Sequence, residues 1–260
     1  MKVEQLYQHF RKEEQPFIQQ VANWIEQVEM QYAPVLTYYL DPRERYIMET
    51  MVSSTELKVQ FYSALPCAER QRALLYPDYF VPEAEDFEEQ IYQIDYAHQF
   101  GTIKHHQILG AIMHCGIRRE VLGDIITDGV HYQFAVTESM GDYLAMQVTQ
   151  IGRKTVHLKK IINNQILQPI DESQRESTTI ASFRLDNVVA NVYNIPRQHA
   201  KQLVQNGRVK VNFSPMNRSD FQLACDDIVS IRGYGRFRIT KIGSKTRKDR
   251  YHIDFSVLRK

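Results

Sequence analysis

The sequence predicts an α+β protein of three parts. Three observations support this: apolar residues at helical spacing near the N-terminus, a central order of strand, helix, two strands, helix and strand, and a basic unit of short helices and strands at the C-terminus. The boundaries we expect are an N-terminal helical region at 1–82, a central domain at 83–162, a polar linker at 163–181 and a C-terminal domain at 182–260.

Two helices are predicted in the N-terminal region. In the first, a proline suits the opening turn and apolar residues follow at helical spacing: Pro16, Phe17, Val21, Trp24 and Val28. The second begins at the sequence DPRE, where Asp41 can cap the helix and Glu44 can complete a capping box. Ile47 and Met51 of this second helix are then expected to face inward.

The central domain is predicted to be a ferredoxin-like or RRM-like αβ sandwich. Its elements follow the order of that fold, with a strand at IYQIDY, a helix over 104–116, strands at 124–127 and 131–136, a helix from 137 and a last strand at TVHLKKI. Aromatic residues on such a sheet can stack on RNA bases, which makes Tyr92, Tyr96, Tyr132 and Phe134 candidates. Core packing is the preferred interpretation, because no RNP-like K/R-G-F-x-F run accompanies them.

Charge is divided unevenly along the chain. The formal net charge is only +1, yet residues 182–260 hold 16 Lys/Arg against 6 Asp/Glu, and the preceding residues hold 16 against 25. Such asymmetry favours a basic module that meets a polyanion, against the simpler alternative of a solvated basic face.

The C-terminal domain concentrates these cations. A first helix buries Leu185, Val188, Val189 and Val192, and a second runs from Pro196 to a Gly207 cap with Ala200, Leu203 and Val204 inward. Arg197, Lys201 and Arg208 are expected to form a stripe away from the core. In the strand that follows, Val209, Val211 and Phe213 should alternate inward, so that Lys210 and Asn212 join the stripe on a common face.

The remaining C-terminal sequence extends the basic surface. FQLACDDIVSIRGYGRFRI predicts two strands and a turn, with Phe237 and Ile239 inward and Arg236 and Arg238 outward. KIGSKTRKDR predicts a basic loop before a final strand, YHIDFSV. Lys and Arg on such a surface would bind phosphates and release their counterions.

These motifs resemble a known family. R-L-D, A-K-Q-L-V-x-x-G-x-V-x-V-N and D-D-I-V-S-I-R, over residues 184–232, are similar to the ribosomal-protein S-four RNA-binding domain. Ile195-Pro196 stands where that family usually has Ser before its Arg, and Phe213 replaces a common Gly. LTYYLDPRER, CAERQRALLYPDYF, the I-L-G-A-I-M-x-x-G-I-x-R-E-x-x-G-D-I stretch and SIRGYGRFRI resemble the YlmH family over the whole chain, although SALP (63–66) replaces a glycine pair.

The resemblance implies an S-four-type αβ RNA-binding domain at the C-terminus. It also implies rRNA binding on the large ribosomal subunit, in ribosome-associated quality control of stalled, tRNA-blocked subunits. Peptidyl-tRNA is a candidate additional partner, and a monomer in the cytoplasm is expected. Genes of this family often lie among cell-division genes, which gave it an older division label.

Structured rRNA is therefore expected to contact a set of basic and amide side chains: Arg184, Arg197, Gln198, Lys201, Arg208, Lys210, Asn212, Arg232, Arg236, Arg238, Lys245, Arg247 and Lys248. Secondary RNA contacts are predicted at Arg118, Arg119, Arg153 and Lys154. Asp186 is expected to order Arg184 and the helix start, and not to contact RNA.

The sequence disfavours a membrane protein, a secreted protein and a metal-binding protein. No apolar run reaches the roughly 18 residues of a membrane span, and the N-terminus is too polar for a secretory signal. Three widely spaced cysteines, without a CxxC pair, favour a reducing compartment and no metal. A surface or packing role is likewise preferred over a metal site for the predicted helix that holds His105, His106, His114 and Cys115.

No cofactor and no catalytic activity are expected. Asp95, Asp124 and Asp142 lie in the central domain without a paired base, a nucleophile or a cofactor loop, and the given sequence ends at Lys260, before any further catalytic domain. Two alternatives stay open: an RNA-modifying enzyme that uses the central domain, and a cell-division-linked interaction protein.

Overall fold

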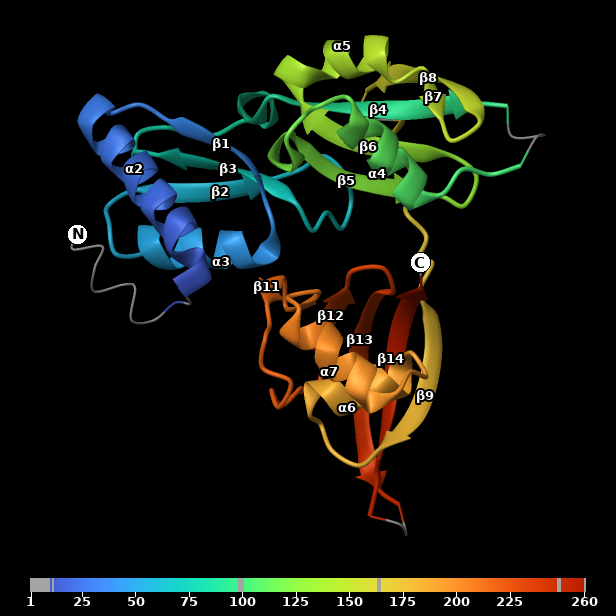
Figure 1. The fold of residues 1–260 in the computed structure, drawn as a ribbon. Coiled ribbons are helices and arrows are strands. Elements are labelled where there is room, and N and C mark those ends of the chain that lie inside the picture. Colours follow the sequence, from blue (N-terminus) through green and yellow to red (C-terminus); the bar gives the residue numbers. More distant parts are fainter. Residues whose placement is uncertain (1–9, 11, 98–100, 163–164, 247–248, 260) are drawn as a thin grey trace. The chain divides into compact units, whose positions relative to one another are not determined.

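The computed structural model describes residues 10, 12–97, 101–162, 165–246 and 249–259. The chain divides into two compact units, Met1–Ile170 and Asp171–Lys260. Both mix helices with antiparallel sheets, which confirms the α+β class (Figure 1). Among the described residues, no helix is both long enough and apolar enough to span a membrane.

The first part of unit 1 contains the two predicted helices and, in addition, a three-stranded sheet. Its elements are η2 (Lys12–Glu14), α2 (Gln15–Gln31), β1 (Val35–Leu40), α3 (Pro42–Val52), β2 (Lys58–Tyr62) and β3 (Gln71–Tyr76). The strands pair antiparallel in the order β1-β3-β2. The predicted N-terminal helical region therefore also contains a sheet that the sequence analysis did not predict: short runs rich in Val, Leu and aromatic residues form strands because α2 and α3 bury one face of their sheet (Figure 1).

The predicted cap of α3 is present. The Asp41 side chain accepts hydrogen bonds from the backbone N–H of Arg43 and Glu44, and the Glu44 carboxylate accepts one from Asp41 N. Ile47 and Met51 are buried, as their spacing predicts. This reciprocal capping fixes where α3 begins.

The central part of unit 1 has the predicted ferredoxin-like arrangement. It comprises η3 (Ala84–Phe87), β4 (Glu89–Tyr96), α4 (His105–His114), η5 (Arg119–Val121), β5 (Leu122–Thr127), β6 (Tyr132–Thr137), α5 (Glu138–Gln147), β7 (Gln150–Ile151) and β8 (Lys154–Ile161). The strands are antiparallel in the order β5-β6-β4-β8-β7. Ile108, Ile112 and Leu144 of the two helices pack with Phe134 and other sheet residues in one core.

The two parts of unit 1 are joined by partly buried polar contacts. The Tyr39 hydroxyl donates to Glu89 Oε2 at 2.7 Å, and Glu89 also accepts from Ala64 N and Ser63 Oγ. The Asp124 carboxylate accepts from the backbone N–H of Glu69 and Arg70, neighbours in the loop before β3. Burial is the main cause that raises the pKa of both carboxyl groups, Glu89 and Asp124.

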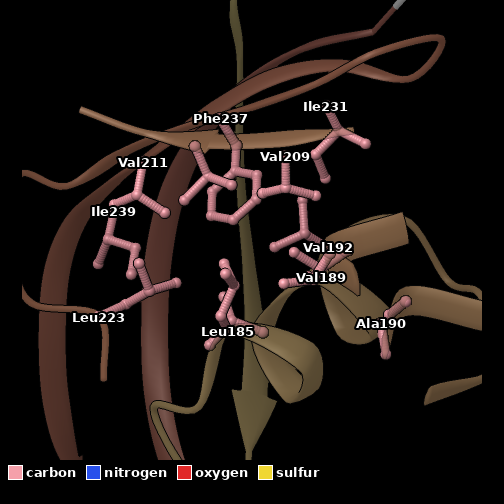
Figure 2. Packing of buried hydrophobic residues seen from close by; sticks show 14 of the residues in the cluster. Leu185, Val189, Ala190, Val192, Val209, Val211, Leu223, Ile231, Phe237 and Ile239 are labelled. Atoms are coloured by element: carbon pink, nitrogen blue, oxygen red, sulfur yellow. The ribbon is translucent and has the colours of Figure 1, made fainter. Parts of the chain in front are cut away.

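Unit 2 is a single six-stranded antiparallel sheet covered on one face by two helices. It consists of β9 (Gln174–Ile180), α6 (Leu185–Val192), α7 (Arg197–Gln205), β10 (Val209–Val211), β11 (Ser214–Pro215), β12 (Ile228–Ile231), β13 (Gly235–Lys245) and β14 (Tyr251–Arg259). The strand order is β11-β10-β12-β13-β14-β9. Figure 2 shows Phe237, Val209 and Val211 of the sheet in one cluster with Leu185 and Val189 of α6.

Two sequence-based boundaries change in unit 2. The range predicted as a linker, 163–181, contains strand β9, which pairs with β14 along Gln174–Ile180. The first half of the predicted basic loop at 241–250 is strand as well, since β13 extends to Lys245. Both segments are polar because one or both of their faces meet solvent, and their pairing depends on partners that are distant in the sequence.

Candidate nucleic-acid interface

A buried carboxylate organises the basic surface of unit 2. The Asp186 side chain, only 3% exposed, receives two hydrogen bonds from Arg184, through Nε and Nη2 at 3.2 Å each. It receives two more from Arg197, at 3.2 and 3.3 Å. The Asp186 carboxylate, in the first turn of α6, thus binds Arg184, just before α6, and Arg197, the first residue of α7. Each guanidinium donates two hydrogen bonds to it.

The guanidinium groups of this pair remain accessible. The Arg184 side chain is 35% exposed and that of Arg197 is 55% exposed. The hydrogen bond to Asp186 is the first cause that raises the pKa of Arg184. Because each guanidinium uses one edge for Asp186, its other edge can bind a further acceptor.

Arg218 adds a cation outside the set predicted from the sequence. Its Nη2 lies 3.5 Å from Asp220, and this contact, followed by weaker effects that include the charge of Arg184, lowers the pKa of Asp220. The backbone N–H of Asp186 bonds to Ser219 O, which places this turn at the start of α6. The N-R-S-D sequence at 217–220 is an ordinary turn pattern, so only the folded structure brings Arg218 near Arg184.

Helix α7 presents the rest of this surface. Lys201 is exposed one turn after Arg197, and Gln198 is exposed between them. In the described structure no side chain caps the first turn of α7, which follows Pro196. We call Arg184, Arg197, Lys201 and Arg218 the helix-side cluster.

A second set of cations projects from the opposite face of the sheet. Lys210 is exposed between the buried Val209 and Val211, so it points away from the helices. Arg236 and Arg238 alternate in the same way with Phe237 and Ile239. The prediction that Lys210 shares one face with Arg197 and Lys201 is therefore wrong. Strand alternation places Lys210 on the side of the sheet opposite to α7.

The strand register arranges these outward cations. Ser230 pairs with both Lys210 and Arg236, so these two lie on either side of Ser230 in one cross-strand row, about 10 Å apart. Ser256 likewise pairs with Arg238 and with Arg175. We call Arg175, Lys210, Arg236 and Arg238 the sheet-side row; Arg175 was missed because its segment was interpreted as linker.

Arg208 and Arg232 lie at the end of strands β10 and β12. Both are exposed, and the Arg232 N–H bonds to Arg208 O at 2.9 Å. Arg208 directly precedes β10 and Arg232 directly follows β12, so at this end of the two antiparallel strands they extend the basic surface of unit 2.

Of the predicted RNA contacts, two are engaged within the fold and two lie outside the described residues. The Asn212 side chain donates to Asp227 at 2.8 Å and accepts from Ile228 N at 2.9 Å, which commits it to the β10–β12 connection. Lys245 pairs with Asp249 at 2.7 Å and stands over the Tyr251 ring. Arg247 and Lys248 lie outside the described residues.

Strand β10 ends at Val211, two residues earlier than predicted. Val211 pairs with Ser214, and the two residues between them, Asn212 and Phe213, have φ of 48° and 67°. Phe213 therefore sits in a two-residue turn and does not alternate inward as a core residue, because both turn positions need positive φ.

The four predicted secondary contacts in unit 1 differ in availability. Arg118 is 84% exposed and Arg153 is exposed in the β7–β8 turn. The Arg119 guanidinium donates to Leu122 O and Gly123 O, and burial is the first cause that lowers its pKa to about 10. Lys154 contacts Gly101 O and lies over the Tyr96 ring.

The central sheet does not offer the aromatic platform of an RRM. Tyr92, Tyr132 and Phe134 are buried beneath α4 and α5, as the preferred interpretation held. The other face is partly covered by the chain itself. Leu65 and Leu167 pack there against Ile91 and its neighbours, and Gln133 hydrogen-bonds to the backbone of residues 165 and 167.

The histidines of α4 form no metal cluster. No group of three or more His, Cys, Asp or Glu side chains that could hold an ion occurs in the described ranges. His114 and Cys115 line a surface hollow of about 510 Å³ together with Gln107, Gln147 and other residues. Tyr234, in the β12–β13 turn, hydrogen-bonds to His199 at 3.0 Å and packs against Tyr193, so its ring supports α7.

Comparisons with known proteins agree with this three-part layout. Three family models match: "YlmH, N-terminal" at residues 13–80, the RNA-binding domain in YlmH at 82–165, and "S4 domain" at 183–229. The "Ribosome-associated protein quality control protein P2" of Bacillus subtilis (strain 168) is 38% identical over 250 residues, which cover 96% of this chain and 97% of that protein.

A solved structure shares part of the fold. "Cell division protein ylmH from Streptococcus pneumoniae" superposes with a TM-score of 0.54 at 32% sequence identity, over 62% of this chain and 99% of that one. The near-complete alignment with the Bacillus protein and the three matching family models establish the relationship: this chain belongs to the YlmH family and carries its RNA-binding domains.

Proposed function

We propose that this chain binds structured rRNA on the large ribosomal subunit and acts in quality control of stalled subunits. The observation that carries the proposal is the pair of accessible guanidinium groups, Arg184 and Arg197, held by the buried Asp186. A full-length relative is named for ribosome-associated quality control, which supports the ribosome as the site of action.

The helix-side cluster suits the backbone of an A-form RNA. Double-stranded RNA is recognised mainly by shape, through phosphate and 2′-OH contacts. Two guanidinium groups fixed by one carboxylate lose little side-chain entropy when they bind phosphates, because their positions are already set. Lys201 and the uncapped start of α7 add positive potential beside them.

The sheet-side row and the edge residues Arg208 and Arg232 extend the proposed RNA footprint. Peptidyl-tRNA on the stalled subunit is a further proposed partner, and the chain is proposed to act as a monomer without catalysis. Under this proposal, rRNA modifications mapped in a deletion strain are unchanged, whereas loss of a modification would favour an RNA-modifying enzyme.

The test is sedimentation of lysate on sucrose gradients at low and high salt, with the protein followed by blot. The wild-type protein is expected with free large subunits at low salt and at the top of the gradient at high salt. Lys201→Glu should remove it from the subunits at low salt. Lys58→Glu, an exposed charge reversal in unit 1, is the matched control and should leave association intact.

Lys201 is preferred over Arg197 for the reversal. A glutamate at position 197 would face the buried Asp186, so loss of binding could reflect damage to the fold. If the Lys201→Glu variant sediments with subunits like the wild type, the helix-side cluster is not the RNA site. Protein that stays at the top at low salt would overturn ribosome binding altogether.

A further inference from the structure

An exposed pair of tyrosines marks a second surface, remote in sequence from the RNA-binding domain. Tyr32 follows α2 and is 60% exposed, and Tyr79 lies in the loop after β3 and is 55% exposed. Met30 and Val81 flank them and are each 80% exposed. We call these four residues the Tyr32–Tyr79 patch.

The two tyrosines are held in place by the fold. The Tyr79 hydroxyl donates to Tyr32 O at 2.7 Å, and the ring centroids are 5.1 Å apart. Tyr32 itself is anchored by its N–H, which bonds to Val28 O at the end of α2. Single exposed apolar residues are ordinary, but an exposed aromatic pair tied by a hydrogen bond is a rigid contact surface.

The two chain segments that carry the patch hold acidic residues and no cation, and the strand register places one lysine nearby, Lys58, opposite Tyr76. No Lys or Arg occurs between Lys12 and Arg43, nor between Arg72 and Lys104, and the patch lies within these two segments. Exposed carboxylates stand close to it in the sequence, at Glu26, Glu29, Asp78 and Glu83. Such surroundings repel phosphates and attract cations.

Other tyrosines in the described chain receive a cation from the protein itself. Tyr46, which is also 55% exposed, has the Arg43 guanidinium 5.3 Å from its ring centroid, and Tyr96 has Lys154 at 5.2 Å. The two segments of the patch hold no cation that could play this part. The exposed faces of these rings can therefore accept a cation from a partner.

We propose that the Tyr32–Tyr79 patch docks an extended protein segment rich in arginine or lysine. Aromatic faces would bind the cationic heads, the nearby carboxylates would pair with them, and Met30 and Val81 would cover the aliphatic stems. The small patch fits a linear segment better than a whole domain. A second copy of this chain is disfavoured, because two such patches would bring like charges together.

The test uses the full chain and a fluorescein-labelled peptide of five Arg-Gly repeats, with binding measured by fluorescence anisotropy at physiological salt. The wild-type protein is expected to bind, and Tyr79→Ala to bind about fivefold more weakly. Tyr46→Ala is the matched control, with the same exposure in the wild type and no expected loss. Tyr79→Phe keeps the ring and should retain most of the affinity.

Several outcomes would overturn the proposal. They are absence of peptide binding by the wild type, wild-type affinity in a folded Tyr79→Ala variant, or equal binding of a Ser-Gly repeat peptide. Displacement of the peptide from the patch by an RNA hairpin would instead identify a nucleic-acid site. None of these results bears on the helix-side cluster, so the two proposals fail independently.

Discussion

Arg197, the first residue of α7, forms a two-point ion pair with Asp186 in the first turn of α6. The same carboxylate also binds Arg184, so three residues spread over 14 positions of sequence act as one unit. The side chain of Asp186 is nearly inaccessible, whereas both arginines reach solvent. The negative charge therefore has a positioning role, and the positive charges are the ones that can meet a ligand.

Replacing Asp186 with Asn tests this positioning role. Asparagine keeps the shape but removes the charge, so both guanidinium groups lose their fixed partner. We expect the free energy of unfolding to fall by about 1 to 3 kcal/mol, and RNA affinity to fall although net positive charge rises. Urea denaturation and RNA binding at fixed salt measure the two effects.

The control for this variant is Asp220→Asn. Asp220 pairs with Arg218 at the surface, where the pair is screened, so its loss should leave the unfolding midpoint unchanged. Tighter RNA binding by Asp186→Asn would show that charge alone governs affinity. That result would remove the role assigned to Asp186.

The Asn212–Phe213 turn gives a stability prediction. Phe213 has φ of 67° and stands where the resembled S4 domain sequences commonly have Gly. Phe213→Gly would create an Asn-Gly turn, the pair best suited to two positive φ values in a hairpin. We expect stabilisation by about 0.5 to 1 kcal/mol, after allowance for the flexibility of glycine in the unfolded chain.

Chemical denaturation of unit 2 in the full chain measures this effect. Asn212→Gly is the contrasting variant, because it also relieves a positive φ but removes the hydrogen bonds to Asp227 and Ile228. It should be destabilising. If Phe213→Gly also destabilises, the Phe213 ring contributes more packing than its position in the turn indicates.

Local sequence signals predicted those parts of the fold that local interactions determine. The α3 capping box at Asp41 and Glu44, and the buried faces of α6 and α7, follow from spacing alone. Strand β9 was missed because its sequence is polar and its partner, β14, lies about 75 residues away. The sharing of Asp186 between two helices, and the opposite directions of Lys201 and Lys210, depend on tertiary packing that spacing does not report.

Gly235 and Gly233 offer a matched pair at the β12–β13 turn. Both have positive φ, 112° and 95°. A Cβ at Gly235 would lie 1.9 Å from the backbone oxygen of Leu258, whereas one at Gly233 would meet nothing within 4 Å. Gly233→Ala should therefore lower the free energy of unfolding by about 1 kcal/mol, the penalty for an alanine at positive φ. Gly235→Ala should lower it by more than about 3 kcal/mol, because the overlap with Leu258 is added.

Thermal and urea unfolding of the two alanine variants measure this difference. The comparison isolates steric overlap, because the chemical change is the same at both positions. Equal destabilisation would mean that β13 and β14 separate at this end without cost, contrary to the pairing of Gly235 with Arg259.

Glu89 gives a prediction for the pH dependence of stability. Burial raises the pKa of its carboxyl group in the folded protein above that in the unfolded chain, despite hydrogen bonds from Tyr39, Ala64 and Ser63. Between these two pKa values the folded state binds more protons than the unfolded state, so the free energy of unfolding falls as pH rises above about 4.5. Glu89→Gln cannot ionise and should lose this part of the slope.

Glu176 should give the opposite pH dependence. Arg259 lowers the pKa of Glu176, so the stability that this carboxylate contributes is lost as pH falls through its folded pKa. Urea midpoints from pH 4 to pH 7 should therefore drop less steeply for Glu89→Gln than for the wild type, whereas Glu176→Gln should remove a loss at the acid end. Parallel curves for wild type and Glu89→Gln would show that the Glu89 carboxyl group ionises as readily in the folded protein as in the unfolded chain.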